Sequence, residues 1–223
     1  MMTLDHELTG QFSIKRAGNA RRKLYETSKR ALDITLAATG LLVLSPLLIG
    51  VAVAIFMHDR GPIFFAQTRV GKGGQPFKFW KFRSMSVNAE ALKAALAQQN
   101  QHGDGRTFKM KKDPRITPVG RFIRRFSIDE LPQIYNILIG EMSIVGPRPP
   151  VPQEVAQYTA RDMRRLAVVP GLTCIWQVSG RSELDFEKQV ELDITYIKER
   201  SFLVDMSLIA RTVPAVISGR GAY

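Results

Sequence analysis

The sequence has few of the residues that hold small secreted domains or metal centres together. It contains one cysteine, Cys174, among 223 residues, which excludes an internal disulfide framework and fits a reducing compartment. The three histidines, His6, His58 and His102, lie far apart, and no His/Cys spacing indicates zinc. Any metal is therefore expected to be a hard cation held by carboxylates.

Acidic residues are also scarce. Lys and Arg number 32 against 20 Asp and Glu, which gives a formal net charge of +12. This excess predicts an anionic partner, and nucleic acid, anionic lipid and a phosphorylated substrate all fit it. The length suits one domain with an appendage better than two full domains.

One stretch lacks charge altogether. Residues 34–57 contain no Asp, Glu, Lys or Arg. As a helix they would be about 36 Å long, enough to cross a hydrocarbon core of roughly 30 Å. Ser45 and Pro46 lie at the centre, where proline removes an N–H and crowds the carbonyl of Leu42. The pattern predicts a helix, a break and a second helix, each helix reaching only the middle of a bilayer.

The charges that flank this stretch bear on its topology. Basic residues dominate both 15–30 and 60–83, and the positive-inside rule predicts a cytoplasmic location for each flank. A re-entrant hairpin satisfies both flanks, whereas a proline-kinked bitopic helix and a cleaved signal peptide are the alternatives. We expect a polar and basic segment over 1–28, poorly ordered at its start, a membrane hairpin over 29–58 and a catalytic domain over 59–223.

The region after the hairpin has the pattern of short strands. Residues 63–65 and 77–82 flank the sequence GKGG at 71–74, which predicts a β-hairpin turn rather than a phosphate loop. Aromatic residues alternate with cations over 77–83, and beside a membrane segment this favours the membrane interface over single-stranded nucleic acid.

Two helices are predicted near the C-terminus, over about 186–197 and 202–217. The second carries an apolar stripe of Leu203, Met206, Ile209, Ala210 and Val213. Packing in the core is the expected fate of this stripe, and lying flat on a membrane is the alternative. The sequence does not determine the oligomeric state, and this helix is a candidate contact in a homo-oligomer.

A carboxylate pair occurs in the sequence SIDELPQ at 127–133. Asp129 is predicted to cap a helix that continues to Gly140, with Pro132 in its first turn. Capping alone would explain a lone aspartate. Here, however, the arginines of 121–125 precede it, and a carboxylate beside a phosphate in a cationic cradle can attack phosphorus. Glu130 could hold Mg²⁺ or manage a proton.

Arg148 lies between prolines in the sequence GPRPP at 146–150. A stiff backbone reduces the entropy lost when its guanidinium binds a phosphate. A polyproline surface that docks a partner protein is the alternative.

Taken together, these motifs resemble the bacterial sugar transferase family, the polyprenyl-phosphate hexose-1-phosphate transferases. The resemblance covers about residues 28–223. It is carried by KRALD at 29–33, SP at 45–46, KFRSM at 81–85, SIDELPQ at 127–133, GPRP at 146–149 and WQVSGR at 176–181.

The resemblance implies a compact, helix-rich α/β monotopic domain on the cytoplasmic face of the inner membrane. It further implies Mg²⁺ and an exchange in which Asp129 attacks a UDP-sugar, releases UMP and passes the sugar phosphate to undecaprenyl phosphate. Glu130 would be the second acidic residue, as base or metal ligand. The residues that the resemblance assigns to substrate binding are Lys81, Arg83, Arg124, Gln133, Arg148 and Arg181.

Two other functions fit parts of the sequence. A membrane-tethered nucleic-acid binder would use the basic and aromatic stretches, and a scaffold would dock partners through the prolines of 147–152. If the protein is a transferase, we expect no nucleic-acid partner. A phosphatase of the haloacid dehalogenase type is excluded because the Asp-x-Asp pattern is missing around Asp129. The sequence does not identify the sugar.

Overall fold

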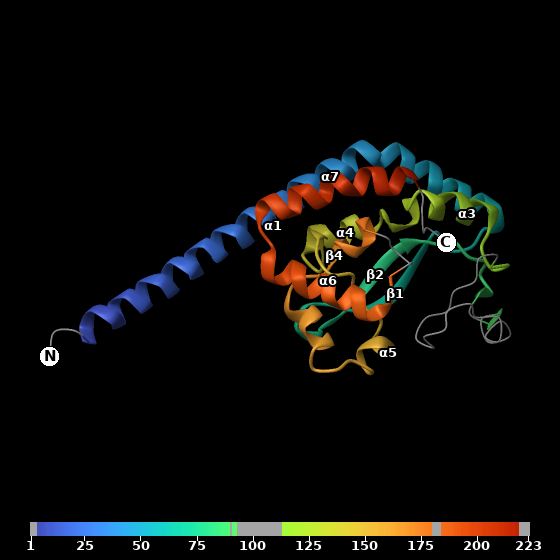
Figure 1. The fold of residues 1–223 in the computed structure, drawn as a ribbon. Helices are drawn as coiled ribbons and strands as arrows, with labels where there is room; N and C mark the ends of the chain where they lie inside the picture. The colour runs from blue at the N-terminus through green and yellow to red at the C-terminus, as the bar shows by residue number, and fades with distance from the viewer. Residues whose placement is uncertain (1–3, 90, 93–112, 180–183, 219–223) are drawn as a thin grey trace.

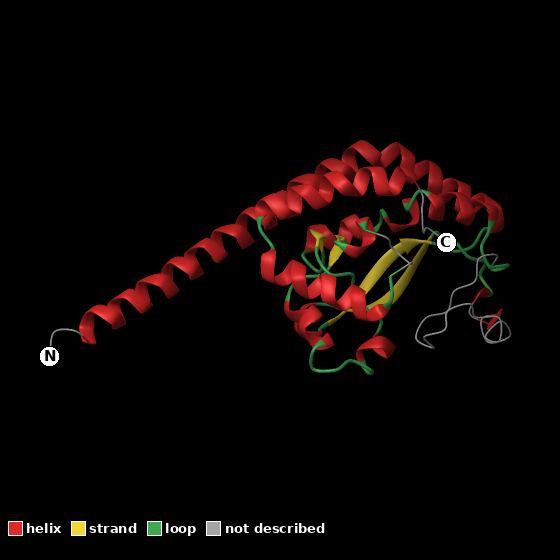
Figure 2. Ribbon diagram, viewed as in Figure 1, coloured by secondary structure: helices red, strands yellow, loops and turns green. Residues whose placement is uncertain are grey.

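The computed structural model describes residues 4–89, 91–92, 113–179 and 184–218. Within them, a long N-terminal helix lies across a body of shorter helices, a β-hairpin and a pair of short parallel strands (Figure 1). Helix predominates over strand throughout the body (Figure 2). The prediction of a helix-rich α/β fold with a short β-hairpin is confirmed.

Helix α1 (Leu4–Asp59) continues through the Ser45-Pro46 pair instead of breaking there as predicted. The hydroxyl of Ser45 donates a hydrogen bond to the carbonyl of Leu42 at 2.8 Å. In an unbroken helix that carbonyl accepts from residue 46, and Pro46 has no N–H to give. The serine therefore supplies the missing donor, and α1 bends over the body while remaining helical (Figure 1). No element ends at the boundary predicted between residues 28 and 29.

Both halves of α1 pack against the same body. Before the proline, Ala37, Leu41 and Leu44 belong to one hydrophobic cluster; after it, Val51 and Ile55 belong to another. The 18-residue window of highest hydropathy in the span 21–59 has a mean hydropathy of 2.5, yet only 11% of it is buried. The helix is thus covered on one side and leaves most of its apolar surface exposed.

The predicted hairpin is present and longer than expected. Strands β1 (Phe64–Val70) and β2 (Pro76–Phe82) are antiparallel, with Phe64 opposite Phe82, and they enclose a 3₁₀ turn (η1, Lys72–Gly74). Phe77, Phe79 and Phe82 are buried, with Phe79 0% exposed. These three phenylalanines therefore belong to the core beneath α1, and their prediction as a membrane interface is wrong, whereas Trp80 is half-buried.

Parallel strands β3 (Ser143–Val145) and β4 (Gly171–Thr173) lie beneath α1 and α7. The remaining described elements are α3 (Pro118–Arg125), η3 (Ile128–Glu130), α4 (Gln133–Ile139), α5 (Pro152–Val155), η4 (Asp162–Ala167), η5 (Trp176–Val178), α6 (Phe186–Glu199) and α7 (Phe202–Ser218). The last two confirm the predicted C-terminal helices.

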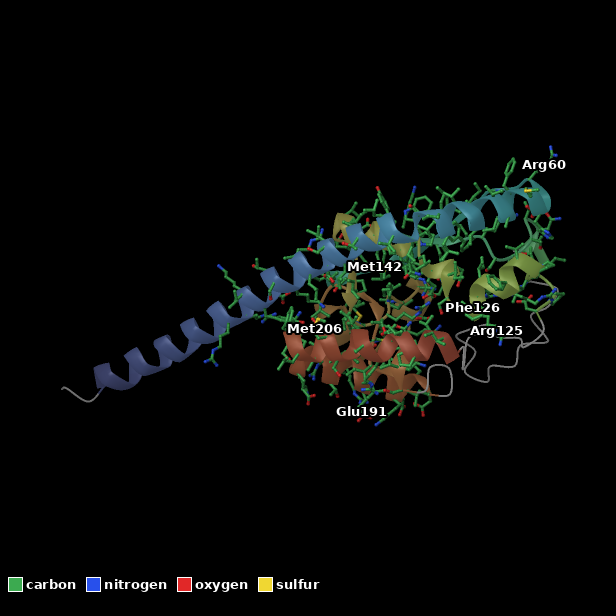
Figure 3. The ribbon with its side chains drawn as sticks, turned by 90° about the horizontal axis from the view of Figure 1, so that it is seen from above. Arg60, Arg125, Phe126, Met142, Glu191 and Met206 are labelled. Atoms are coloured by element: carbon green, nitrogen blue, oxygen red, sulfur yellow. The ribbon has the colours of Figure 1, made fainter. Side chains whose placement is uncertain are left out.

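Helix α7 packs through a different face from the one predicted. Asp205 and Leu208 are buried, whereas Leu203 is 80% exposed and Val213 58% exposed. Met206 lies on the exposed side of α7, in contrast to the buried Met142 (Figure 3). The apolar stripe is thus largely outside the core, because buried polar contacts turn the Asp205 side of the helix inward.

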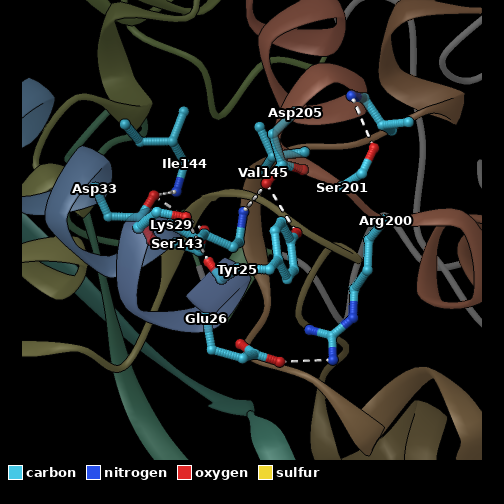
Figure 4. A network of polar contacts seen from close by, with 12 residues as sticks. Tyr25, Glu26, Lys29, Asp33, Ser143, Ile144, Val145, Arg200, Ser201 and Asp205 are labelled. Atoms are coloured by element: carbon cyan, nitrogen blue, oxygen red, sulfur yellow. Dashed lines mark hydrogen bonds and ion pairs between the residues drawn. The ribbon is translucent and has the colours of Figure 1, made fainter. Parts of the chain in front are cut away.

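A polar network joins residues 25–33 of α1 to the C-terminal helices (Figure 4). The ammonium group of Lys29 donates to Asp205 at 2.8 Å, and the hydroxyl of Tyr25 donates to the same carboxylate oxygen at 2.9 Å. Asp33 accepts from the backbone N–H of Ile144 at 2.9 Å and from the hydroxyl of Ser143 at 3.1 Å. These contacts attach α1 to α7 and to strand β3, which leads into the loop that carries Arg148.

Candidate active site

The two carboxylates lie on a 3₁₀ turn and not at the start of the long helix that was predicted. Asp129 and Glu130 belong to η3, and α4 begins at Gln133 with Pro132 as its N-cap. Ser127 enters the turn in the left-handed conformation, with φ of 55°, which separates η3 from α3. Since α4 has seven residues and its cap is a proline, the field of a helix terminus is not part of this site.

Two cations from distant parts of the chain converge on Glu130. Its Oε1 accepts from Nζ of Lys81 at 2.7 Å and from Nη2 of Arg148 at 2.6 Å. Lys81 lies near the end of β2, and Arg148 lies in the loop after β3. The same lysine nitrogen is 3.9 Å from Oδ2 of Asp129. The site therefore has a carboxylate clamped by two cations and a second carboxylate beside it.

The surroundings shift the pKa values of the two carboxylates in opposite directions. Burial raises the pKa of Glu130, but the charges of Arg148 and Lys81 outweigh it and hold that pKa well below its usual value. Burial raises the pKa of Asp129, and Lys81 opposes this only in part. No hydrogen bond within the described chain reaches the Asp129 carboxylate. Glu130 is therefore held in place, while the oxygens of Asp129 remain available to a substrate.

The loop that carries Arg148 is held by close backbone packing. Gly146 donates to the carbonyl of Thr173 at 3.0 Å, and Gly171 donates to the carbonyl of Pro147 at 2.9 Å. A Cβ atom on Gly171 would lie 2.0 Å from the nitrogen of Gly146. Only glycine permits this approach, and it places Arg148 against Glu130.

Two further residues of the site were not predicted. The ring of Phe79 has three cations around it: the guanidinium carbon of Arg69 is 5.1 Å from the ring centroid, Nζ of Lys81 is 5.4 Å and the guanidinium carbon of Arg148 is 5.9 Å. Arg69 was noted only among the basic residues that follow the apolar segment. Its position in β1, on the strand paired with the one that carries Phe79 and Lys81, is the signal that could have identified it.

The other predicted substrate-binding residues lie in different surroundings. Arg83 forms a two-pronged ion pair with Asp59 at the end of α1, outside the cluster around Glu130. Gln133 is 0% exposed, and neither end of its amide has a partner within the described chain. The charge of Arg124 acts on Asp129, as predicted for a cation near the site. Arg181 lies outside the described residues.

The two carboxylates are candidate ligands for the expected magnesium ion. Among the residues that the structure describes, no three acidic, histidine or cysteine side chains gather into a cage. Mg²⁺ is commonly bound by one or two carboxylates together with substrate phosphates. The adjacent Asp129 and Glu130 fit that arrangement. Oε2 of Glu130 is the less engaged oxygen, since within the described part of the chain it accepts only from Arg148, at 3.3 Å.

The chain is similar to known proteins over nearly its whole length. The model of the family described as "Bacterial sugar transferase" matches residues 24–219. The chain is 48% identical over 201 residues to "Galactosyl transferase CpsE" of Streptococcus agalactiae, covering 87% of this chain and 43% of that protein. It is 38% identical over 226 residues to "Exopolysaccharide production protein ExoY" of Sinorhizobium fredii, covering 100% of both.

A third relative carries the most explicit name. It is the "UDP-glucose:undecaprenyl-phosphate glucose-1-phosphate transferase" of Escherichia coli, 43% identical over 203 residues, with 87% of this chain and 41% of that protein covered. The chain thus spans less than half the length of two of these relatives and the full length of the third.

Proposed function

Because this chain belongs to the bacterial sugar transferase family and is a transferase, we propose that it moves a hexose 1-phosphate from a UDP-sugar to undecaprenyl phosphate. The product would begin the assembly of an exopolysaccharide, a capsule or another glycan. The names of the relatives support both substrates. The observation that carries the proposal is the pairing of two carboxylates among fixed cations: Asp129, which is buried and has a 3.9 Å ion pair with Lys81 but no hydrogen bond from the described residues, and Glu130, which is clamped.

In the first step an oxygen of Asp129 attacks the β-phosphorus of the donor. An acyl phosphate bond forms, the bond to the bridging oxygen breaks, and UMP leaves with the bonding electrons. In the second step an oxygen of undecaprenyl phosphate attacks the same phosphorus, which forms the lipid diphosphate and returns the Asp129 carboxylate. Dividing one displacement into two is the general advantage of a covalent nucleophile.

The surrounding side chains would position and neutralise the phosphates. Lys81 lies within reach of both carboxylates, so it can stabilise negative charge first on Asp129 and then on the phosphoryl group that is transferred. Arg148 presents a planar guanidinium suited to two phosphate oxygens. Magnesium, held by Glu130 together with the donor diphosphate, would add positive charge where the leaving group develops negative charge.

We further propose that α1 enters the cytoplasmic face of the inner membrane and returns to it. The residues of α1 from Ala37 to Ile55 rest on the same body before and after Pro46. A helix that crossed the bilayer would carry its second half away from that body. Ser45 supports the bend, because it satisfies a carbonyl that would otherwise lack a partner in hydrocarbon.

This topology predicts that both ends of α1 face the same side of the membrane. In a Cys174→Ala background, Leu24→Cys and His58→Cys place single thiols at exposed positions of α1 before and after the uncharged stretch over 34–57. A membrane-impermeant maleimide should label both from the cytoplasmic side of inverted vesicles and neither from the outside of intact spheroplasts. Labelling of the two thiols from opposite sides would establish a kinked bitopic helix.

The activity is tested with the full chain in nanodiscs that contain undecaprenyl phosphate. A panel of UDP-sugars is added with and without Mg²⁺, and UMP release and phosphosugar bound to the protein are measured. One donor should release UMP in a reaction that depends on Mg²⁺, and without the acceptor a phosphosugar should remain on residue 129. If no donor releases UMP, the proposal fails. Salt-sensitive nucleic-acid binding in its place would favour the nucleic-acid alternative.

A further inference from the structure

Arg69 is a charged residue that the contacts described above leave without a counterion. Its Nη1 donates to the carbonyl of Pro149 at 2.9 Å, and its Nε donates to the side-chain oxygen of Gln67 at 3.1 Å. No carboxylate oxygen of the described chain lies within 4.0 Å of its guanidinium, and Nη2 has no hydrogen-bond acceptor there. Both partners are neutral, so no ion pair within the described chain compensates the charge, and Glu154 and Glu130 act on it only from a distance.

The neighbours of Arg69 make this arrangement costly. The guanidinium lies over the buried ring of Phe79, and Arg148 lies over the same ring. Burial and the like charge of Arg148 lower the pKa of Arg69 to about 10. A largely desolvated cation beside another cation is unfavourable unless an anion joins them. Glu130 supplies one negative charge, and Arg148 and Lys81 already divide it.

The position of Arg69 is also distinct from that of Lys81. The charges of Lys81 and Arg124 lower the pKa of Asp129, whereas Glu154 and Tyr158 raise the pKa of Arg69. Arg148 and Glu130 affect both pKa values. Arg69 contacts the carbonyl of Pro149, the residue after Arg148. Arg69, Lys81 and Arg148 thus surround the ring of Phe79, and among the residues that the structure describes Lys81 is the one in an ion pair with Asp129.

We infer that Arg69 and Arg148 form a phosphate-binding pair over the ring of Phe79. On the proposed function, on which this assignment rests, the phosphoryl group that is transferred lies beside Asp129 and Lys81. The pair then holds the other phosphate of the donor, the one that leaves as UMP. Two guanidinium groups present several N–H donors to one phosphate, and the phosphate supplies the missing negative charge.

The same contacts allow a purely structural role, in which Arg69 only fastens the loop at Pro149. The two roles differ in their effect on the protein without substrate. An arginine that binds an anion carries an unfavourable buried charge until phosphate is bound. Replacing such an arginine should therefore leave the free protein as stable as before or more stable. A structural arginine should destabilise the free protein when it is replaced.

The test compares Arg69→Gln with the wild type and with Arg165→Gln, using the full chain in nanodiscs. Arg165 is buried, whereas Arg69 is half-buried, and Arg165 is paired with Asp193 at 2.7 Å, so it is a control for losing a paired arginine. Thermal unfolding is followed without ligand and with increasing UMP, pyrophosphate or a short-chain polyprenyl phosphate.

We expect Arg69→Gln to keep or raise the unfolding temperature of the free protein and to weaken UMP and pyrophosphate binding by about tenfold or more. Its affinity for polyprenyl phosphate should not change. Arg165→Gln should unfold at a lower temperature without ligand but keep its affinity for UMP. A lower unfolding temperature for Arg69→Gln together with wild-type UMP affinity would overturn the inference.

The remaining outcomes separate this inference from the proposed function. If Arg69→Gln weakens polyprenyl phosphate binding and spares UMP, the pair serves the acceptor phosphate, and its assignment to the leaving nucleotide is wrong. If the wild type binds pyrophosphate through Arg69 but never binds UMP or turns over a UDP-sugar, the proposed function fails while the anion site stands.

Discussion

Replacing Asp129 with asparagine is expected to lower the rate of UMP release by at least about 10³-fold without unfolding the protein. The asparagine has nearly the same shape, and no hydrogen bond to the aspartate is lost within the described chain. It lacks the charged oxygen that attacks phosphorus. The measurement is initial-rate UMP release at saturating donor, together with mass spectrometry for phosphosugar on the protein.

Two further variants make this result specific. Glu191→Gln removes an exposed carboxylate on α6, paired with Lys188 at the surface, and should leave the rate unchanged. Glu130→Gln should lower the rate while a phosphosugar still forms on residue 129, because Glu130 positions Lys81 and Arg148. An Asp129→Asn protein that still becomes labelled with phosphosugar would rule out Asp129 as the nucleophile.

Replacing Lys29 with methionine is expected to lower the free energy of unfolding by about 3–5 kcal/mol. The change leaves the carboxylate of Asp205 buried without its countercharge, since the side chain of Asp205 is 2% exposed. The measurement is chemical denaturation in detergent, monitored by circular dichroism. Because Lys29 attaches α1 to α7, we also expect the membrane helix to separate from the body early in unfolding.

Two controls test whether the loss comes from the buried charge. Lys188→Met removes a lysine from an exposed pair and should change stability by no more than about 1 kcal/mol. The double change Lys29→Met with Asp205→Leu should recover part of the loss, because it removes both buried charges. Equal effects of Lys29→Met and Lys188→Met would show that the network in Figure 4 adds little to stability.

Much of the architecture could be predicted because it depends on neighbours along the chain. The uncharged run over 34–57 predicted a helical membrane segment, although not its continuity through Pro46, and the glycines at 71–74 predicted a turn between two strands. The carboxylate pair and Arg148 were identified from motifs. Asp129 was misplaced at a helix start because the left-handed conformation of Ser127, which ends α3, has no periodic pattern in the sequence.

Other features depended on which segments meet. Arg83 was grouped with Lys81, two residues before it, and a continuing strand would keep both side chains on one face. Strand β2 ends at Phe82, however, between the two residues. Arg83 pairs with Asp59, and Lys81 pairs with Glu130. On α7, hydrophobicity indicated that Leu203 would face the core, whereas the buried Asp205 and its contacts with α1 decided the rotation of the helix.

The sequence by itself determined the family, the exposed apolar helix, the hairpin and the residues that the motifs contain. The tertiary structure alone decided that Glu130 is clamped while Asp129 accepts no hydrogen bond from the described residues, and that Arg69 joins Arg148 around Phe79. The physical reason is the distance along the chain over which each effect acts. Propensity and hydrophobic periodicity act over a few residues, whereas a counterion, a buried charge or a shared aromatic ring depends on the packing of segments that lie far apart in the chain.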